Sequence, residues 1–311
     1  MDKLLHVSAT PHIHSGRSTQ QIMRDVIIAL LPATVAGALI FGPRALLVVA
    51  VTTAACVLFE FLFNMIVKKD QTVSDLSAAV TGLLLGLNLP VSAPIWQCIV
   101  GALFAIVVVK CLFGGIGYNL VNPAITARVF MLVAFGGSMA NHGQPFNADT
   151  ASSATPLAVM ADGGSVSLTN LLLGTVGGTI GETCAIALLA GFAYLLIRRI
   201  ISWHIPVAYI GTVFILSLLA HGFDVMHALS YILSGGLILG AVFMATDYVT
   251  SPPTPNGKLL FGLGAGLLTF LIRDFGVYPE GVSFAILFMN ILTPYIERLT
   301  AHKVFGGSAE K

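Results

Sequence analysis

The chain has 311 residues, of which 56% are apolar and 9% are charged, and its formal net charge is +1 at pH 7. A soluble domain of this length needs far more charge to coat its surface, whereas lipid surrounds most of a polytopic membrane protein. The composition therefore predicts an all-α protein that crosses a lipid bilayer several times, and the near-zero net charge gives no sign of a nucleic-acid partner.

The chain begins with a polar tail, residues 1–21, which carries His12, His14 and Arg17. This tail has no short apolar region followed by a small-residue cleavage site, so we expect no removable signal peptide.

Ten apolar segments follow the tail, each near the roughly 20 residues that a helix needs to cross a bilayer. They cover residues 22–42, 45–67, 75–89, 94–112, 121–136, 180–197, 205–221, 226–246, 258–273 and 281–298. The third and fifth are short, which favours half-helices or helices sunk within the protein. We therefore predict about ten transmembrane helices, some short or broken, in two groups of five. The groups span 22–136 and 180–298, with a loop at 137–179 and a second tail at 299–311.

Basic residues predict the orientation of these segments. With the N-terminus in the cytoplasm, only Arg44 and Arg273 lie at outer ends, and Arg128 lies within a segment. The inner ends then collect Lys3, Arg17, Arg24, Lys68, Lys69, Lys110, Arg198, Arg199, Lys258, Arg298, Lys303 and Lys311. This asymmetry predicts that both termini are cytoplasmic and that the 137–179 loop lies on the outer face.

The two groups of five segments share a short pattern. Leu76-Ser77 precedes Gly82-Leu-Leu-Leu-Gly86 in the third segment, and Leu229-Ser230 precedes Gly236-Leu-Ile-Leu-Gly240 in the eighth. Ordinary glycine-rich helix packing explains either copy alone. Because the copies stand at equal positions, we favour an internal repeat, and five segments per copy make it an inverted-topology repeat.

Charged residues inside apolar segments or at their ends are candidates for function. Glu60 and Asp247 are candidates for an ion path, since such carboxylates pair with a cation, stay protonated or contact a translocated ion. Arg128 follows Asn122-Pro123, where the N-terminus of a helix can hold an anion, and is a candidate for cofactor binding or for a structural ion pair. We interpret Glu182 as an acidic residue in the first turn of its helix.

The sequence offers no catalytic residues and no metal site of its own. The histidines show neither H-x-x-x-H nor H-E-x-x-H spacing, and no Walker sequence or convincing dinucleotide fingerprint is present. The cysteines make no C-x-x-C pair, so we expect buried free thiols rather than an iron–sulfur site within this chain. They are Cys56, Cys98, Cys111 and Cys184.

The loop at 137–179 contains the stretch Asp149-Thr-Ala-Ser-Ser-Ala-Thr155. A solvated turn is the ordinary interpretation of such a stretch. It resembles, however, the flavinylation motif Asp-x-x-(Ser/Thr)-Gly-Ala-(Ser/Thr). In that motif the last hydroxyl carries FMN through a phosphoester that a dedicated flavin transferase makes. Asp149, Ser152, Ala154 and Thr155 match, and Ser153 stands where glycine is usual. The resemblance implies covalent FMN on Thr155.

Four further stretches resemble the D subunit of the Rnf complex, an ion-translocating ferredoxin:NAD oxidoreductase of bacterial membranes. They are Ser8-Ala-Thr-Pro-His-Ile-His14, Leu84-Leu-Gly-Leu-Asn-Leu-Pro90, Asn122-Pro-Ala-Ile-Thr-Ala-Arg-Val-Phe130 and Met244-Ala-Thr-Asp-Tyr-Val-Thr-Ser-Pro252. The B subunit of the sodium-pumping NADH:quinone reductase is a close relative with a typically longer N-terminal extension, so the short tail favours the Rnf side. The resemblance implies a ten-span inner-membrane subunit, other membrane and peripheral subunits as partners, and a noncovalent riboflavin that no motif places.

Three functions follow as hypotheses. The leading one is a subunit that couples electron transfer between ferredoxin and NAD to Na⁺ or H⁺ translocation and is not catalytic alone. The alternative is a channel or transporter for a small solute without a redox role, since inverted repeats with short helices serve such proteins too. A third is a scaffold that only anchors redox partners.

Overall fold

The structure is a computed structural model that describes residues 17–152, 154–276 and 281–301. The described part is almost entirely helical, with one two-stranded antiparallel sheet. The helices of the first half are α1 (Thr19–Phe41), α2 (Pro43–Val67), the 3-10 helix η1 (Val73–Asp75), α3 (Ser77–Leu87), α4 (Ile95–Leu103), the π-helix η2 (Phe104–Cys111) and α5 (Pro123–Ala134).

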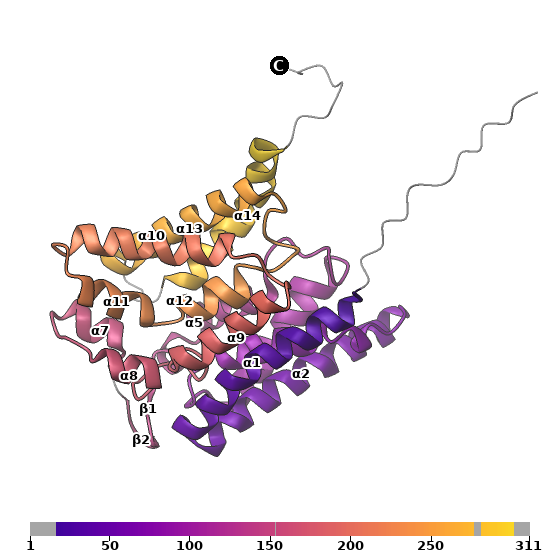
Figure 1. Ribbon diagram of the computed structural model, residues 1–311. Helices are drawn as coiled ribbons and strands as arrows, with labels where there is room; N and C mark the ends of the chain where they lie inside the picture. The colour runs from indigo at the N-terminus through magenta and orange to yellow at the C-terminus, as the bar shows by residue number, and fades with distance from the viewer. Residues whose placement is uncertain (1–16, 153, 277–280, 302–311) are drawn as a thin grey trace, which may run out of the picture.

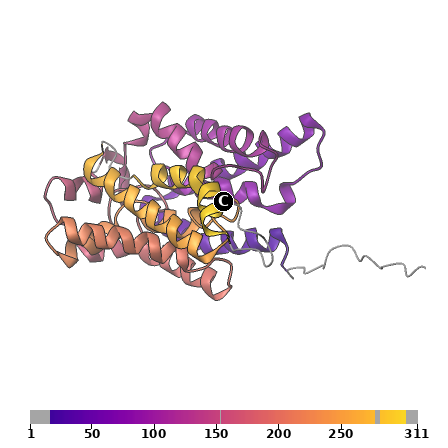
Figure 2. The same ribbon diagram turned by 90° about the horizontal axis from the view of Figure 1, so that it is seen from above.

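The connection between the halves is structured. It contains α6 (Gly136–Met139), β1 (Gly143–Gln144), β2 (Asn147–Ser152), α7 (Pro156–Ala161) and α8 (Leu168–Leu173). The second half contains α9 (Ala185–Ile197), α10 (His204–Ala220), α11 (Val225–Leu233), α12 (Leu237–Leu239), the π-helix η3 (Gly240–Met244), α13 (Pro255–Phe275) and α14 (Val282–Thr300). In Figures 1 and 2, α1 and α2 lie along one side of the molecule, whereas α10, α13 and α14 lie along the other.

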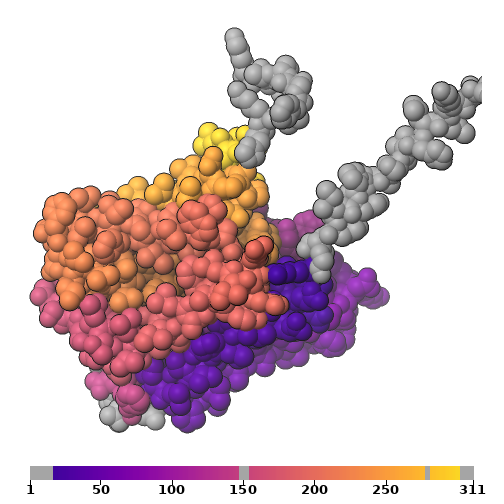
Figure 3. Space-filling view, viewed as in Figure 1, coloured from indigo at the N-terminus to yellow at the C-terminus, as the bar shows by residue number. Residues whose placement is uncertain are grey.

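Helix α1 begins with a capping box, in which Ser18 accepts from the N–H of Gln21 and the Gln21 side chain accepts from the N–H of Ser18. From there α1 runs the length of the molecule and packs against α9, the first long helix of the second half (Figure 1). The space-filling view in Figure 3 shows the two halves in continuous contact along this line.

Glycines set the closest helix contacts. A Cβ on Gly82 would lie 2.6 Å from the Cα of Thr53, and one on Gly86 would lie 3.0 Å from the Cα of Val49, so α3 packs directly on the α2 backbone. In the second half, a Cβ on Gly240 would meet the side chain of Val282 rather than a backbone. Close packing of α13 on α10 instead uses two glycines outside the repeated pattern, Gly262 and Gly266.

Each of the ten predicted segments contains a helix, but some bounds were wrong. The predicted helix 226–246 is broken, and α11 and the helical stretch 237–244 meet at a bend of 64°. The predicted helix 180–197 begins only at Ala185, so Glu182 lies in an irregular segment and not in a first helical turn. Glycines and buried polar residues lie at both places.

The helices make this a multi-pass helical membrane protein of the predicted class. Three described helices, α1, α2 and α14, are long and apolar enough to cross a membrane, and the bent pair makes a fourth if it counts as one span. Five shorter apolar helices accompany them: Ser77–Leu87, Ile95–Cys111, Pro123–Ala134, Ala185–Ile197 and His204–Ala220. The number of ten crossings stays a prediction.

Candidate functional site

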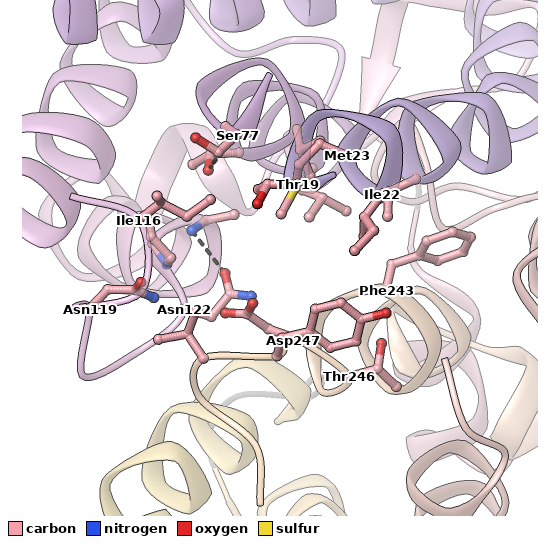
Figure 4. A pocket seen from close by; sticks show the side chains of 18 of the residues that line it. Thr19, Ile22, Met23, Ser77, Ile116, Asn119, Asn122, Phe243, Thr246 and Asp247 are labelled. Atoms are coloured by element: carbon pink, nitrogen blue, oxygen red, sulfur yellow. Dashed lines mark hydrogen bonds between the residues drawn. The ribbon is translucent and has the colours of Figure 1, made fainter. Parts of the chain in front are cut away.

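A cavity of about 400 Å³ opens between the two halves of the protein. Its walls come from the first turns of α1, the first turns of α3, the stretch 116–124, the end of α9 and the stretch 242–249. Figure 4 shows Asn119, Asn122 and Asp247 facing the apolar side chains of Ile22 and Met23 across this space. The cavity is therefore mostly apolar, with a few polar groups gathered on one wall, as in small-molecule binding sites.

Asn122 fixes this polar wall. Its Oδ1 accepts from the N–H groups of Ala124 at 3.0 Å and Ile125 at 3.3 Å, and its Nδ2 donates to the carbonyl oxygen of Met244 at 3.3 Å. Pro123 has no N–H group, and Asn122 accepts from the N–H groups of the next two residues. The first turn of α5 therefore has its N–H donors bonded within the protein. The expectation that this helix end holds an anion stays a prediction.

Asp247 lies in the cavity wall, just after the π-helix η3, and is half-buried. Its Oδ2 accepts from the hydroxyl of Thr250 at 3.1 Å. Burial raises the pKa of this carboxyl above its ordinary value, against hydrogen bonds from Thr250 and from the backbone of Val249 and Tyr248. Asp247 thus retains a proton more readily than a solvated aspartate does.

Glu60 lies behind the cavity wall, where it forms a buried ion pair. Its carboxylate accepts from Nζ of Lys110 at 2.9 and 3.0 Å and from the hydroxyl of Thr72 at 2.8 Å. Lys110 also donates to the hydroxyl of Ser77, and both Lys110 and Ser77 line the cavity. From the sequence, Glu60 has no evident partner and Lys110 is only a basic residue at an inner helix end. The structure joins them.

Arg128 is buried in α5 and is not among the residues that line the cavity. Cys56, Cys98 and Cys111 are buried free thiols, as predicted, whereas Cys184 is half-buried. Within the described ranges no group of three or more His, Cys, Asp or Glu side chains is placed to hold a metal ion.

The stretch that resembles the flavinylation motif lies on the sheet and on the turn that follows it. Residues 147–152, with Asp149 and Ser152, form β2, and the side chains of this strand, like Ser153, lie outside the described part. Ala154 is exposed and Thr155 is half-buried. Thr155 precedes α7, and its hydroxyl accepts from the N–H of Ala158 at 3.3 Å. The hydroxyl of this half-buried residue thus makes one long hydrogen bond.

The cavity and the motif lie at opposite ends of the molecule. Thr19 and Ile22, at the start of α1, line the cavity, whereas the N–H of Phe146 in the β-hairpin donates to Ile40 at the end of α1 at 2.8 Å. A helix of 23 residues is about 35 Å long. Figure 1 shows α7, α8 and the hairpin at the end of the molecule opposite the start of α1. The distance between the cavity and the motif is thus close to the thickness of a bilayer's hydrocarbon core.

Comparison with known proteins gives a consistent result. The family model for the NQR2, RnfD, RnfE family matches residues 6–306. The chain is 45% identical to the D subunit of the Na⁺-translocating ferredoxin:NAD⁺ oxidoreductase complex of Acetobacterium woodii, with 97% of this chain and 95% of the relative covered. It is 39% identical to the D subunit of the proton-translocating ferredoxin:NAD⁺ oxidoreductase complex of Clostridium ljungdahlii, with 96% of each covered. It is 37% identical to the D subunit of the ion-translocating oxidoreductase complex of Stutzerimonas stutzeri, with 94% and 93% covered. The resemblance to the D subunit of the Rnf complex is confirmed.

Proposed function

The chain belongs to the NQR2, RnfD, RnfE family, and on that premise we propose that it is a membrane subunit of a redox-driven ion-translocating oxidoreductase. It acts with other membrane and peripheral subunits, which bring electrons between ferredoxin and NAD, and it is not catalytic alone. The observation that carries this proposal is similarity along nearly the whole chain to proteins named as the D subunits of such complexes. Those names differ in the ion, so either Na⁺ or H⁺ is the translocated species.

Thr155 carries FMN through a phosphoester in this proposal. The match of Asp149, Ser152, Ala154 and Thr155 to the flavinylation motif supports it, as does the partial exposure of Thr155. A threonine hydroxyl is unreactive at neutral pH, so a flavin transferase must activate it, and the chain needs no base of its own. The flavin supplies the redox chemistry, while the protein fixes its position and potential.

The cavity between the halves holds the second, noncovalent flavin. Its volume lies within the range of small-molecule sites, roughly 300–1,000 Å³. The ammonium of Lys110 is engaged by Glu60 and Ser77, and Asp247 adds an acidic group to the wall. A phosphate therefore finds little compensation there, which favours uncharged riboflavin over FMN.

In the proposed topology both termini and the cavity lie on the cytoplasmic side of a bacterial inner membrane, and Thr155 lies on the outer face. The basic residues at the predicted inner ends support this orientation. The ten-segment order supports two inverted five-helix repeats. Glu60 and Asp247 remain the proposed ion-path carboxylates.

Flavin attachment is tested by coexpression with the transferase and fluorescence of the denatured chain in a gel. Wild-type protein is expected to give a flavin band, Thr155→Ala none, and Thr155→Ser, which keeps the hydroxyl, a band again. The intact mass should rise by one FMN on the single peptide that contains Thr155. Equal fluorescence from Thr155→Ala removes the attachment proposal.

The alternative of a solute channel without a redox role has its own test. Flavin-free protein in liposomes would then pass a small neutral or cationic solute at the rate of the flavin-loaded form. The scaffold hypothesis is tested by Glu60→Gln and Asp247→Asn, because unchanged ion pumping in both variants would remove the two ion-path assignments.

A further inference from the structure

A chain of hydrogen bonds joins the cavity to the connection between α2 and α3. Nζ of Lys110 donates to the hydroxyl of Ser77 at 2.5 Å, and this hydroxyl donates to Oδ1 of Asp75, also at 2.5 Å. The N–H of Ser77 donates to the same carboxylate oxygen at 2.7 Å. Lys110 and Ser77 line the cavity, whereas Asp75 is not among the lining residues. The chain therefore leads from the cavity wall into the connection.

The two ends of this chain differ in their access to water. Lys110 is 3% exposed and Ser77 is 6% exposed, whereas Asp75 is half-buried, so water reaches the Asp75 carboxylate. In the proposed topology this connection lies on the cytoplasmic side, together with Lys68 and Lys69. With a ligand in the cavity, a buried ammonium that gives up a proton regains one only through its hydrogen-bonded neighbours. Ser77 and Asp75 are such neighbours.

Lys110 is held in a position from which it can act on the cavity. It lies in the last turn of the π-helix η2, and π-turns inside helices occur frequently at functional sites. Besides its bond to Ser77, Nζ donates to both carboxylate oxygens of Glu60, at 2.9 and 3.0 Å. Two of the three N–H groups therefore point at one carboxylate. One such bond is enough to hold the ammonium, so the other N–H can turn toward a base in the cavity.

We propose that Asp75, Ser77 and Lys110 form a proton-transfer path from the cytoplasmic water to the cavity. Lys110 is the donor at the cavity, and Ser77 and Asp75 return a proton to it. This inference rests on the proposed function, in which the cavity holds a flavin that receives electrons through partner subunits. A side chain placed within hydrogen-bond reach speeds proton transfer to a group whose basicity rises during the reaction.

The proton balance of the path is simple. Two electrons that enter the cavity make one ring nitrogen of the flavin basic, and one proton binds there. An N–H bond of Lys110 breaks with its electron pair left on Nζ, and a new N–H bond forms at the ring nitrogen. Neutral Nζ then takes the proton of the Ser77 hydroxyl, Ser77 takes one from the Asp75 carboxyl, and Asp75 takes one from water. One proton moves inward, and the partner subunits supply the electrons.

The path reaches the cavity apart from its other acidic group. Figure 4 shows Ser77 on the side of the cavity that α3 forms, opposite Asp247. Asp247 accepts from the hydroxyl of Thr250, within its own turn of the chain. The path therefore serves one side of a ligand, and Asp247 contacts the other side. A change at Ser77 or Asp75 alters the path without altering the wall that contains Asp247.

The path is tested by rapid mixing of the riboflavin-loaded full chain in detergent with dithionite, in H₂O and in D₂O. The absorbance change that reports protonation of the reduced flavin gives the rate. Ser77→Val should slow this step about tenfold or more and give it a solvent isotope effect, whereas Ser77→Thr, which keeps the hydroxyl, should stay near the wild-type rate. Asp75→Asn should also slow it. The matched control is Asp70→Asn, an exposed aspartate of the same connection.

The proposal is overturned if Ser77→Val protonates the flavin as fast as Ser77→Thr, or if Asp75→Asn is as fast as Asp70→Asn. Should Ser77→Val fail to fold, the comparison of the two aspartate variants decides the matter. Riboflavin binding by the same proteins is measured from the quenching of riboflavin fluorescence. A wild-type chain that binds no riboflavin refutes the flavin in the cavity and the path with it. Riboflavin binding with equal rates in all variants refutes the path alone.

Discussion

Each half of the protein buries one basic side chain at the same place in its order of segments, but the two side chains have different hydrogen-bond partners. Lys110, in the fourth segment, contacts the side chains of Glu60 and Ser77. Arg273, in the ninth segment, contacts the backbone carbonyls of Tyr231 and Ser234. Ser77 belongs to the Leu-Ser pair of the third segment, and Tyr231 directly follows that of the eighth, so each cation holds the corresponding helix of its own half.

This difference in partners follows from the helix that each basic side chain contacts. In the first half α3 is unbroken, so its backbone groups are bonded within the helix and the lysine takes side-chain partners. In the second half the helix stops at Leu233, which leaves carbonyls that need donors, and the planar guanidinium supplies them. An equivalent charge therefore closes an ion pair in one half and caps a helix break in the other.

The largest expected effect comes from removing the lysine. Lys110→Met leaves Glu60 buried without its cation, so the free energy of unfolding should fall by about 3–5 kcal/mol. Denaturant titration of the purified chain in detergent measures this fall. The double variant Lys110→Met with Glu60→Gln should recover most of the loss, because no unpaired charge remains. A single variant as stable as wild type would show that the pair contributes nothing.

A smaller loss of unfolding free energy is expected when Arg273 is replaced. Arg273→Met removes the two charge-assisted hydrogen bonds to α11 and should lower the free energy of unfolding by about 2–4 kcal/mol. Arg273→Lys should recover only part of this, since an ammonium cannot match the guanidinium fork. If lysine restores full stability, the contrast between side-chain and backbone partners does not matter energetically.

Next in size is the packing contrast between the matched glycines. Gly82→Ala drives a Cβ against the Cα of Thr53 at 2.6 Å and should cost about 1–3 kcal/mol in the same titration. Gly240→Ala meets only the flexible side chains of Val282 and Ile286 and should cost less. Equal costs would mean that the unbroken α3 is no more tightly held than its counterpart.

The smallest effect is a pH dependence at Asp247, which is half-buried. The pKa of this carboxyl is raised in the folded state, so its stabilising contribution is complete below the ordinary aspartate pKa and is lost as pH rises through the raised value. Asp247→Asn should flatten the Tm profile between about pH 4 and neutrality, since asparagine does not titrate. An unchanged slope in this variant would place the titrating group elsewhere.

Much of the fold could be predicted from apolar runs, because every one of the ten runs contains a helix. The break at residues 234–236 could not be, since Ser234-Gly-Gly interrupts neither the hydropathy nor the length of its run. Asp247 and Asn122 were singled out by their position near helix ends, and the structure brings both to one cavity. The partnership of Glu60 with Lys110 joins residues 50 positions apart, which no local pattern reveals.

The contact between α1 and α9 has a consequence for how the protein is made. Asp25 is buried in α1, and its carboxylate accepts from Tyr194 at 3.1 Å and from Arg198 at 3.2 Å, the latter 173 residues later in the chain. A ribosome adds roughly 5–20 residues per second, so α1 waits on the order of 10–35 s for this arginine. During that time an acidic side chain in the first inserted helix has neither partner. The insertion machinery, or another subunit, must shelter that face of α1 until the second half arrives.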